Sequence, residues 1–121
     1  MPNSRITIED YAGVALVTFT DSAILDSTVI EQIAKDLYRL PDQMHKQKVI
    51  LDFSRVKSLS SGAIGVLINL KKKLSDIKGS LALCGVPPEV RRLFDITRLE
   101  KEFSFYPDDS AALKAFDVHV R

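Results

Sequence analysis

The sequence predicts an α/β fold, with a mixed, mostly parallel β-sheet that starts with an antiparallel hairpin and packs against about four helices. Apolar runs typical of strands occur at 6–9, 14–19, 49–52, 80–84 and 103–106. Stretches with apolar residues every three or four positions, typical of helices, separate most of these runs. Alternation of strands and helices predicts parallel pairing with right-handed crossovers. Without a linker or an internal repeat, residues 1–121 are expected to form one domain.

The first two strands are expected to form the hairpin. Residues 6–9 alternate between apolar and polar, and Gly13 supplies the positive φ that a tight turn into residues 14–19 needs. A loop over 21–25 should follow, after which Asp26 is a suitable N-cap for a helix. The apolar stripe of this helix is expected to end at Pro41.

The centre of the chain combines a buried strand, a serine-rich turn and a second helix. Val49–Leu51 is continuously apolar and ends at Asp52, as in a strand buried on both faces. After the turn, a helical stripe begins beyond Gly62 and comprises Ala63, Val66, Leu67, Leu70, Leu74 and Ile77. The pair Ser60–Ser61 therefore lies where the strand leads into the helix N-terminus, a position at which open α/β sheets usually bind ligands.

The last third of the chain repeats this alternation. Gly79 is expected to be the C-cap of the second helix, before the strand 80–84. A short helix should begin near Pro88, since proline is tolerated in a first turn. The strand 103–106 and a final helix carrying Ala112, Leu113 and Phe116 complete the chain.

Composition excludes several classes of protein. A net charge of +1 argues against strong attraction to nucleic acid or to anionic membranes. No stretch is long enough to span a bilayer, and a cytoplasmic domain is expected. Cys84, the only cysteine, lies in an apolar run and is expected to be a buried, inert thiol.

Neither catalysis nor a cofactor is expected. A serine nucleophile needs a nearby base, but His45 precedes the central strand and His119 is in the C-terminal tail. Asp21, Asp26 and Asp52 suggest magnesium ligands, yet Asp26 is more simply a cap and Asp52 a strand end.

A basic run, Lys71–Lys73, is open to two interpretations. It is either a phosphate-contacting patch or, as we favour, the solvated face of the helix. No glycine-rich phosphate loop occurs in the chain.

Two interpretations of the serine turn remain open from the residues alone. The first is helix capping, which serine performs well. The second is a phosphorylation switch at Ser61, because a phosphate carrying about −1.5 to −2 charges is tolerated at a helix N-terminus. Such a phosphate would make a neutral surface of small residues anionic and expel a partner docked on it.

Several motifs in this order resemble the STAS domain, and more narrowly the bacterial anti-sigma factor antagonists. They are Leu51-Asp52-Phe53-Ser54-Arg55-Val56, the stretch 59–67 (LSSGAIGVL), and the stretches 85–94 and 94–99. The resemblance covers nearly the whole chain and implies the SpoIIAA-like fold.

The serine turn departs from the family pattern at two places. Ser60 stands where many members have aspartate, and Gly62-Ala63 stand where they have serine-glycine. A gapless match places the phosphoacceptor at Ser61, whereas a literal Ser-Ser-Gly match would choose Ser60. We prefer Ser61, because a gap would rotate the apolar stripe of the helix off the sheet.

The resemblance implies a regulator without enzymatic activity of its own. Its partner would be an anti-sigma factor that is also a serine kinase, contacted through Asp26, Ser60, Ser61, Gly62 and Ala63. The kinase would use ATP and magnesium to phosphorylate Ser61 and end the complex, and a protein phosphatase would restore it. No direct contact with nucleic acid or membrane is expected. The alternative is an unphosphorylated adaptor or scaffold subunit of a stressosome-like or lipid-transport assembly, with or without a small ligand.

Overall fold

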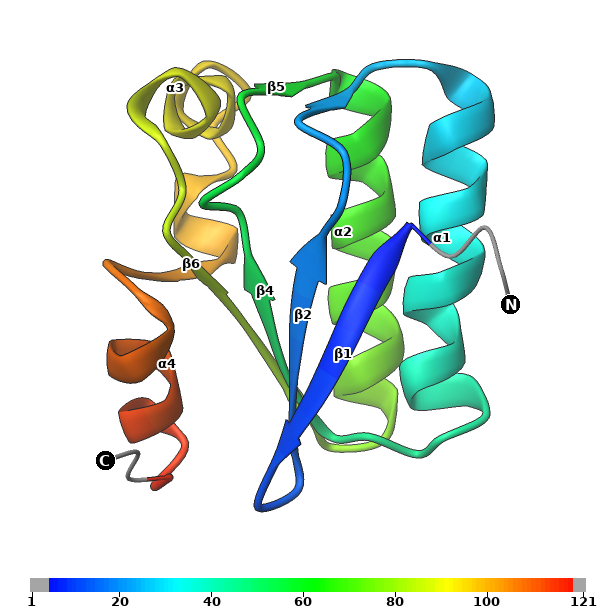
Figure 1. Cartoon of the computed structure of the whole chain (residues 1–121), viewed down its shortest axis with the longest axis vertical. Coiled ribbons are helices and arrows are strands. Elements are labelled where there is room, and N and C mark those ends of the chain that lie inside the picture. The colour runs from blue at the N-terminus through cyan, green and yellow to red at the C-terminus, as the bar shows by residue number, and fades with distance from the viewer. Residues whose placement is uncertain (1–4, 119–121) are drawn as a thin grey trace.

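The computed structural model describes residues 5–118 (Figure 1). In chain order the elements are β1 (Ile6–Tyr11), β2 (Val14–Phe19), β3 (Ala23–Ile24), α1 (Ser27–Asp42), β4 (Lys48–Asp52), β5 (Ser58–Leu59), α2 (Ser61–Asp76), β6 (Ser80–Cys84), α3 (Pro88–Ile96), the 3-10 helix η1 (Glu100–Glu102), β7 (Ser104–Tyr106) and α4 (Asp109–Ala115). The predicted α/β class and the predicted helices and main strands are confirmed.

Five strands form one mixed sheet in the order β1-β2-β4-β6-β7. β1 and β2 are antiparallel, and the other three neighbouring pairs are parallel. The hairpin turn has positive φ at both Ala12 and Gly13, 53° and 91°, as a two-residue turn matching the strand twist requires. The expected antiparallel hairpin is therefore present, and its first strand extends to Tyr11.

Helices cover both faces of this sheet. α1 and α2 lie side by side on one face, while α4 packs on the other (Figure 1). β4 passes between these layers: Val49 and Leu51 belong to the core beneath α1 and α2, and Ile50 to the core beneath α4. All three side chains are fully buried, which confirms the prediction of a strand buried on both faces.

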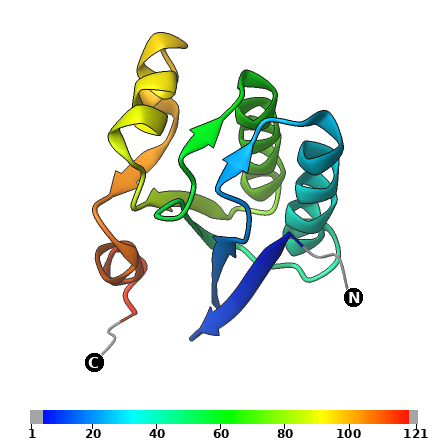
Figure 2. The same cartoon turned by 45° about the horizontal axis from the view of Figure 1, so that its top comes forward.

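Two segments that were expected to be irregular pair with each other and form a second, small sheet. β3 and β5 pair in parallel, with Ala23 opposite Ser58 and Ile24 opposite Leu59. Figure 2 shows these strands beside the starts of α1 and α2, at the same end of the molecule as α3. The small sheet therefore joins the loop before α1 to the serine turn before α2.

Helix ends differ from the expectation at two residues. α1 continues through Pro41 to Asp42, because a proline in the last turn removes only one helical hydrogen bond and its ring is buried. The C-cap of α2 is Ile77, not Gly79, and Lys78 adopts the left-handed conformation with φ 60°. Gly79 is needed for another reason, since a Cβ there would overlap the carbonyl oxygen of Gln47.

Within residues 5–118, no helix combines the length and the apolar character that crossing a bilayer requires. The C-terminal tail from His119, the second histidine considered as a catalytic base, lies outside the described residues.

Candidate functional site

Ser60 caps the N-terminus of α2. Its backbone is extended, with φ −93° and ψ 164°, and its hydroxyl accepts a hydrogen bond from the backbone N–H of Ala63 at 3.4 Å. The carbonyl of Ser60 also accepts from the backbone N–H groups of Ala63 and Ile64. The capping interpretation of the serine turn is thus confirmed for Ser60, whose half-buried side chain is already engaged.

Ser61 is the first residue of α2 and is exposed. Its hydroxyl makes no hydrogen bond with any residue from 5 to 118. The backbone N–H groups of Ser61 and Gly62 also have no acceptor in that part of the chain, as expected for the first turn of a helix. A free hydroxyl therefore lies beside free donors at the positive end of the helix dipole.

The small sheet fixes the position of this turn. The backbone N–H of Ser60 donates to the carbonyl of Ile24 at 3.1 Å, and that of Lys57 donates to the carbonyl of Ser22 at 2.7 Å. Continuing the β3–β5 register places Leu25 opposite Ser60, and the Leu25 side chain is 55% exposed. An exposed apolar residue thus lies next to the serine turn.

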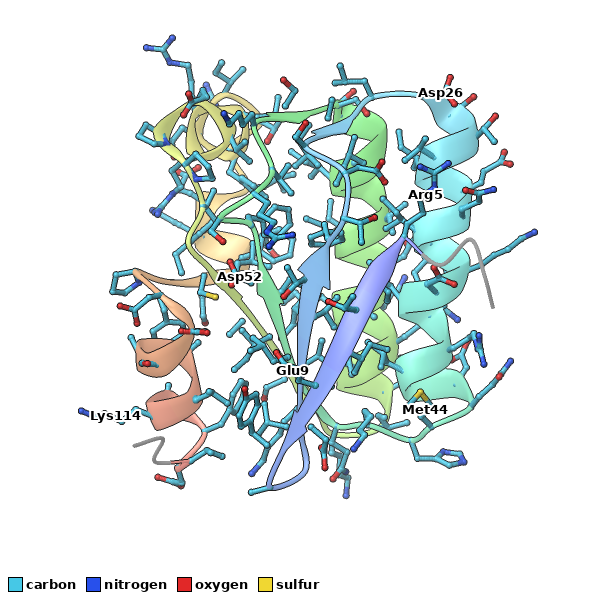
Figure 3. The ribbon with its side chains drawn as sticks, viewed as in Figure 1. Arg5, Glu9, Asp26, Met44, Asp52 and Lys114 are labelled. Atoms are coloured by element: carbon cyan, nitrogen blue, oxygen red, sulfur yellow. The ribbon has the colours of Figure 1, made fainter. Side chains whose placement is uncertain are left out.

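Asp26 caps α1 as expected. Its carboxylate accepts from the backbone N–H groups of Thr28 and Val29, at 3.0 and 3.4 Å. Figure 3 shows Asp26 at the start of α1. The serine turn is at this same end of the molecule. A Cβ on Gly62 would lie 3.7 Å from Cδ1 of Ile30, so the first turns of α1 and α2 are in contact. The site therefore contains two neighbouring helix caps, one anionic and one neutral.

Of the five residues expected to contact a partner, Ala63 is placed differently from the rest. Its side chain points into the core and is 5% exposed, because it belongs to the apolar stripe of α2. Asp26, Ser61 and Gly62 are exposed, and Ser60 is half-buried. A partner that docks on this end of the molecule can contact these four residues, but not the Ala63 side chain.

The three aspartates considered as metal ligands have separate roles. Asp21 pairs with Arg5 at 3.0 Å, Asp26 caps α1, and Asp52 accepts from the backbone N–H of Ser54 at 2.9 Å. Figure 3 shows Asp26 and Asp52 at different levels of the molecule. In the described part of the chain, no three side chains of metal-binding type are grouped together.

Cys84 is fully buried at the end of β6. Burial, together with the charges of Asp52, Asp109 and Asp108, raises the pKa of its thiol to about 12. The thiol is therefore protonated at neutral pH, and the prediction that Cys84 is buried is confirmed.

The basic run on α2 makes contacts within the molecule. Lys71 pairs with Glu102 at 3.4 Å, and Lys73 pairs with Asp42 at 2.9 Å. Lys73 also lies over the ring of Tyr38. Lys72 is exposed, whereas Lys71 and Lys73 are half-buried and paired with carboxylates. The run is therefore not one continuous patch of unpaired charge.

Comparison with known families identifies the class of protein. The family model of the STAS domain matches residues 5–112. The chain belongs to the STAS domain family.

Within that family the chain is similar to anti-sigma factor antagonists. It is 25% identical over 116 residues to the anti-sigma F factor antagonist of Paenibacillus polymyxa, covering 96% of this chain and 97% of the relative. The anti-sigma-factor antagonist (STAS) domain protein of Planctomyces limnophilus superposes with a TM-score of 0.79 at 26% identity, covering 91% and 95% of the two chains. Phosphorylated SpoIIAA of Bacillus has the same fold, with a TM-score of 0.67 at 18% identity over 93% and 96% of the chains.

Proposed function

We propose that this protein is a cytoplasmic anti-sigma factor antagonist that is switched off by phosphorylation of Ser61. The observation that carries the proposal is the exposed Ser61 hydroxyl at the start of α2, without a hydrogen bond to residues 5–118. The unmodified protein binds an anti-sigma factor that has serine kinase activity. This kinase uses ATP and magnesium to modify Ser61, and a phosphatase removes the phosphate.

The geometry favours Ser61 over the two other serines nearby. Ser60 is half-buried, and its hydroxyl caps α2. Ser27 occupies the corresponding first position of α1 and is exposed, but it follows the anionic cap Asp26. A phosphate on Ser27 would be repelled by that carboxylate, whereas Ser61 follows a neutral cap.

The proposed docking surface consists of Leu25, Asp26, Ser60, Ser61 and Gly62. Leu25 provides an exposed apolar side chain, and Gly62 leaves the backbone accessible to close approach. A phosphate in this surface would have to be desolvated when the partner docks, which weakens the complex. The free N–H groups at the start of α2 offset part of the new charge, so the fold should persist. The structure of phosphorylated SpoIIAA is consistent with a fold that tolerates a phosphate.

Binding of the anti-sigma factor to three variants tests the switch. Ser61→Asp should bind at least about tenfold more weakly than the unsubstituted protein, a loss of about 1.4 kcal/mol. Ser61→Ala should bind normally and resist inactivation by kinase and ATP. Ser27→Asp is the matched control, because it adds the same charge at the same helical position of α1, and it should bind more tightly than Ser61→Asp.

Two results would contradict the proposal. One is equal binding by Ser61→Asp and Ser61→Ala while both remain folded. The other is phosphate incorporation at a serine other than Ser61, as located by mass spectrometry after incubation with kinase and ATP. If no phosphate is incorporated at all, the adaptor or scaffold role is the better account.

A further inference from the structure

β1 is an edge strand of the five-stranded sheet, and β2 is its one neighbouring strand among residues 5–118 (Figure 1). The strand at the opposite edge, β7, has three residues, whereas β1 has six and pairs with β2 without a bulge. β1 also contains no proline, glycine or lysine, residues that commonly protect such edges from association. It is therefore long and regular enough for a further strand to pair with it.

The register of the hairpin determines which backbone groups of β1 face outward. The backbone N–H of Thr20 donates to the carbonyl of Arg5 at 3.0 Å, so these two opposed residues form a hydrogen-bonded pair. Hydrogen-bonded and non-hydrogen-bonded pairs alternate along antiparallel strands, so every second residue from Arg5 onward bonds to β2. Ile8 and Asp10 lie between those residues and direct their N–H and C=O groups away from β2.

Exposed apolar side chains lie beside these outward-facing groups. Ile8 is 40% exposed, and Met44, just after α1, is 46% exposed. Together with Ile6, Asp36 and Arg39 they line a hollow of about 250 Å³ between β1 and the second half of α1. The edge of β1 therefore combines free strand donors and acceptors with an apolar surface that a paired strand would cover.

Charge favours one register for the pairing of β1 with β1 of a second copy. With a two-fold axis at Ile8, the two Ile8 residues are opposite each other, and Asp10 is opposite Ile6. An axis at Glu9 or at Asp10 would place like charges directly opposite each other, which is destabilising. The register centred on Ile8 instead places Glu9 opposite Thr7, and an axis at Thr7 would shorten the overlap.

The same register brings opposite charges together. The side chains of Ile6, Ile8 and Asp10 share one face of β1, because side chains alternate along a strand. Arg39 lines the hollow beside Ile6, so the Asp10 carboxylate of the second copy comes next to the Arg39 guanidinium. Within its own chain Asp10 pairs with Lys46 at 2.9 Å, and this exposed pair leaves the carboxylate able to interact with a second cation.

We propose that two copies of this protein form a symmetric dimer by antiparallel pairing of their β1 strands, with the two-fold axis at Ile8. The two Ile8 residues exchange both of their backbone hydrogen bonds and cover each other's side chains. The dimer uses none of the residues of the proposed docking surface around Ser61. It is therefore independent of phosphorylation there.

Sedimentation equilibrium from about 1 µM to about 1 mM protein tests the dimer, and a reversible monomer–dimer equilibrium is expected. The affinity should be low, because one strand edge buries a small area. Ile8→Lys should weaken association by at least about tenfold, since the two-fold axis doubles the lost apolar contact and opposes two ammonium groups. Ile96→Lys is the matched control, because it changes an isoleucine that is 69% exposed on α3, and it should associate like the unsubstituted protein.

Cysteine cross-linking tests the register, since the natural Cys84 is fully buried. In Ile8→Cys the two Cα atoms would be about 5.5 Å apart, within the range of a disulfide, so mild oxidation should give a covalent dimer. In Asp10→Cys the two cysteines would be roughly 14 Å apart along the strands and should not cross-link. A monomer at every concentration, equal weakening in Ile8→Lys and Ile96→Lys, or equal cross-linking of the two cysteine variants would overturn the proposal.

Discussion

The backbone N–H of Ser60 donates to the carbonyl of Ile24 at 3.1 Å and thereby ties the cap of α2 to the strand that precedes α1. Ile24 is 2% exposed and packs among Phe19, Ile30 and Phe53 beneath the small sheet. The serine turn is therefore held both by its own helix and by a buried residue distant in sequence.

Ile24→Ala should destabilise the protein by about 2 to 4 kcal/mol, since it leaves a cavity under this sheet. The amide signals of Ser60 and Ser61 should also move in NMR spectra, because the hydrogen bond from Ser60 depends on the placement of β3. Ile96→Ala is the control, because Ile96 is 69% exposed, and it should change the free energy of unfolding by less than about 0.5 kcal/mol. Similar losses in both variants would show that the small sheet is not anchored by Ile24.

Ser60→Ala should cost about 1 kcal/mol, because the N–H of Ala63 loses the side-chain acceptor of its cap. Ser60→Asp should retain the stability, since aspartate is an equally good N-cap and its charge suits the helix N-terminus. Ser61→Ala removes an exposed hydroxyl without a hydrogen bond to residues 5–118 and is the matched control. Urea unfolding measures the free energy of unfolding of all three variants. A larger loss of stability in Ser61→Ala than in Ser60→Ala would contradict the assignment of Ser60 as the cap.

Two glycines, one within α2 and one just after it, should respond oppositely to substitution by alanine. Gly79→Ala should destabilise by about 1 to 3 kcal/mol, because the new Cβ would overlap the backbone of Gln47. Gly65→Ala should be neutral or stabilise by up to about 1 kcal/mol, since its Cβ would meet open space and alanine favours the helix. Thermal unfolding of both variants tests this contrast. If both are destabilised alike, the close approach at Gly79 is not what selects glycine.

The thiol of Cys84 should make stability fall in alkaline solution. Its pKa is about 12 in the folded protein, against an ordinary value of 9.0. Above about pH 9 the unfolded chain loses the proton first, so the free energy of unfolding decreases as pH rises toward 12. The slope from this group approaches about 1.4 kcal/mol per pH unit.

Cys84→Ala lacks this ionisation, and comparison with it isolates the effect from lysine and tyrosine titration. The stability of the unsubstituted protein should fall more steeply than that of the variant above pH 9. Parallel curves for the two proteins would contradict a buried, protonated thiol.

The elements with strong hydrophobic periodicity were predictable from the sequence. Val49–Leu51 is continuously apolar because one residue faces the core of α4 and two face the core of α1 and α2. The helix after the serine turn was located by its apolar stripe, and it begins at Ser61, two residues before the first residue of that stripe, Ala63. Asp26 was identified as a cap from residue type and position alone, since capping depends on local geometry.

Features that depend on distant contacts were not predictable. β3 and β5 are two residues each, too short for a periodic signal, and they form because the chain brings 22–24 next to 57–60. Gly79 resembled a helix cap in sequence, but the structure shows that a neighbouring backbone segment excludes a side chain there. The burial of Ala63, in contrast, was predictable from its place in the apolar stripe of α2. Because this side chain is buried, the candidate contact surface is limited to the residues around it.

The small sheet has a consequence for how fast the proposed regulator responds. A turn already fixed by β3 and β5 loses little conformational entropy when another protein docks, so recognition need not wait for a segment to become ordered. Under the proposed switch, adding or removing charge on this surface would change affinity without unfolding the domain. One copy of the domain would then pass through many rounds of capture and release, at a pace set by the enzymes that modify it.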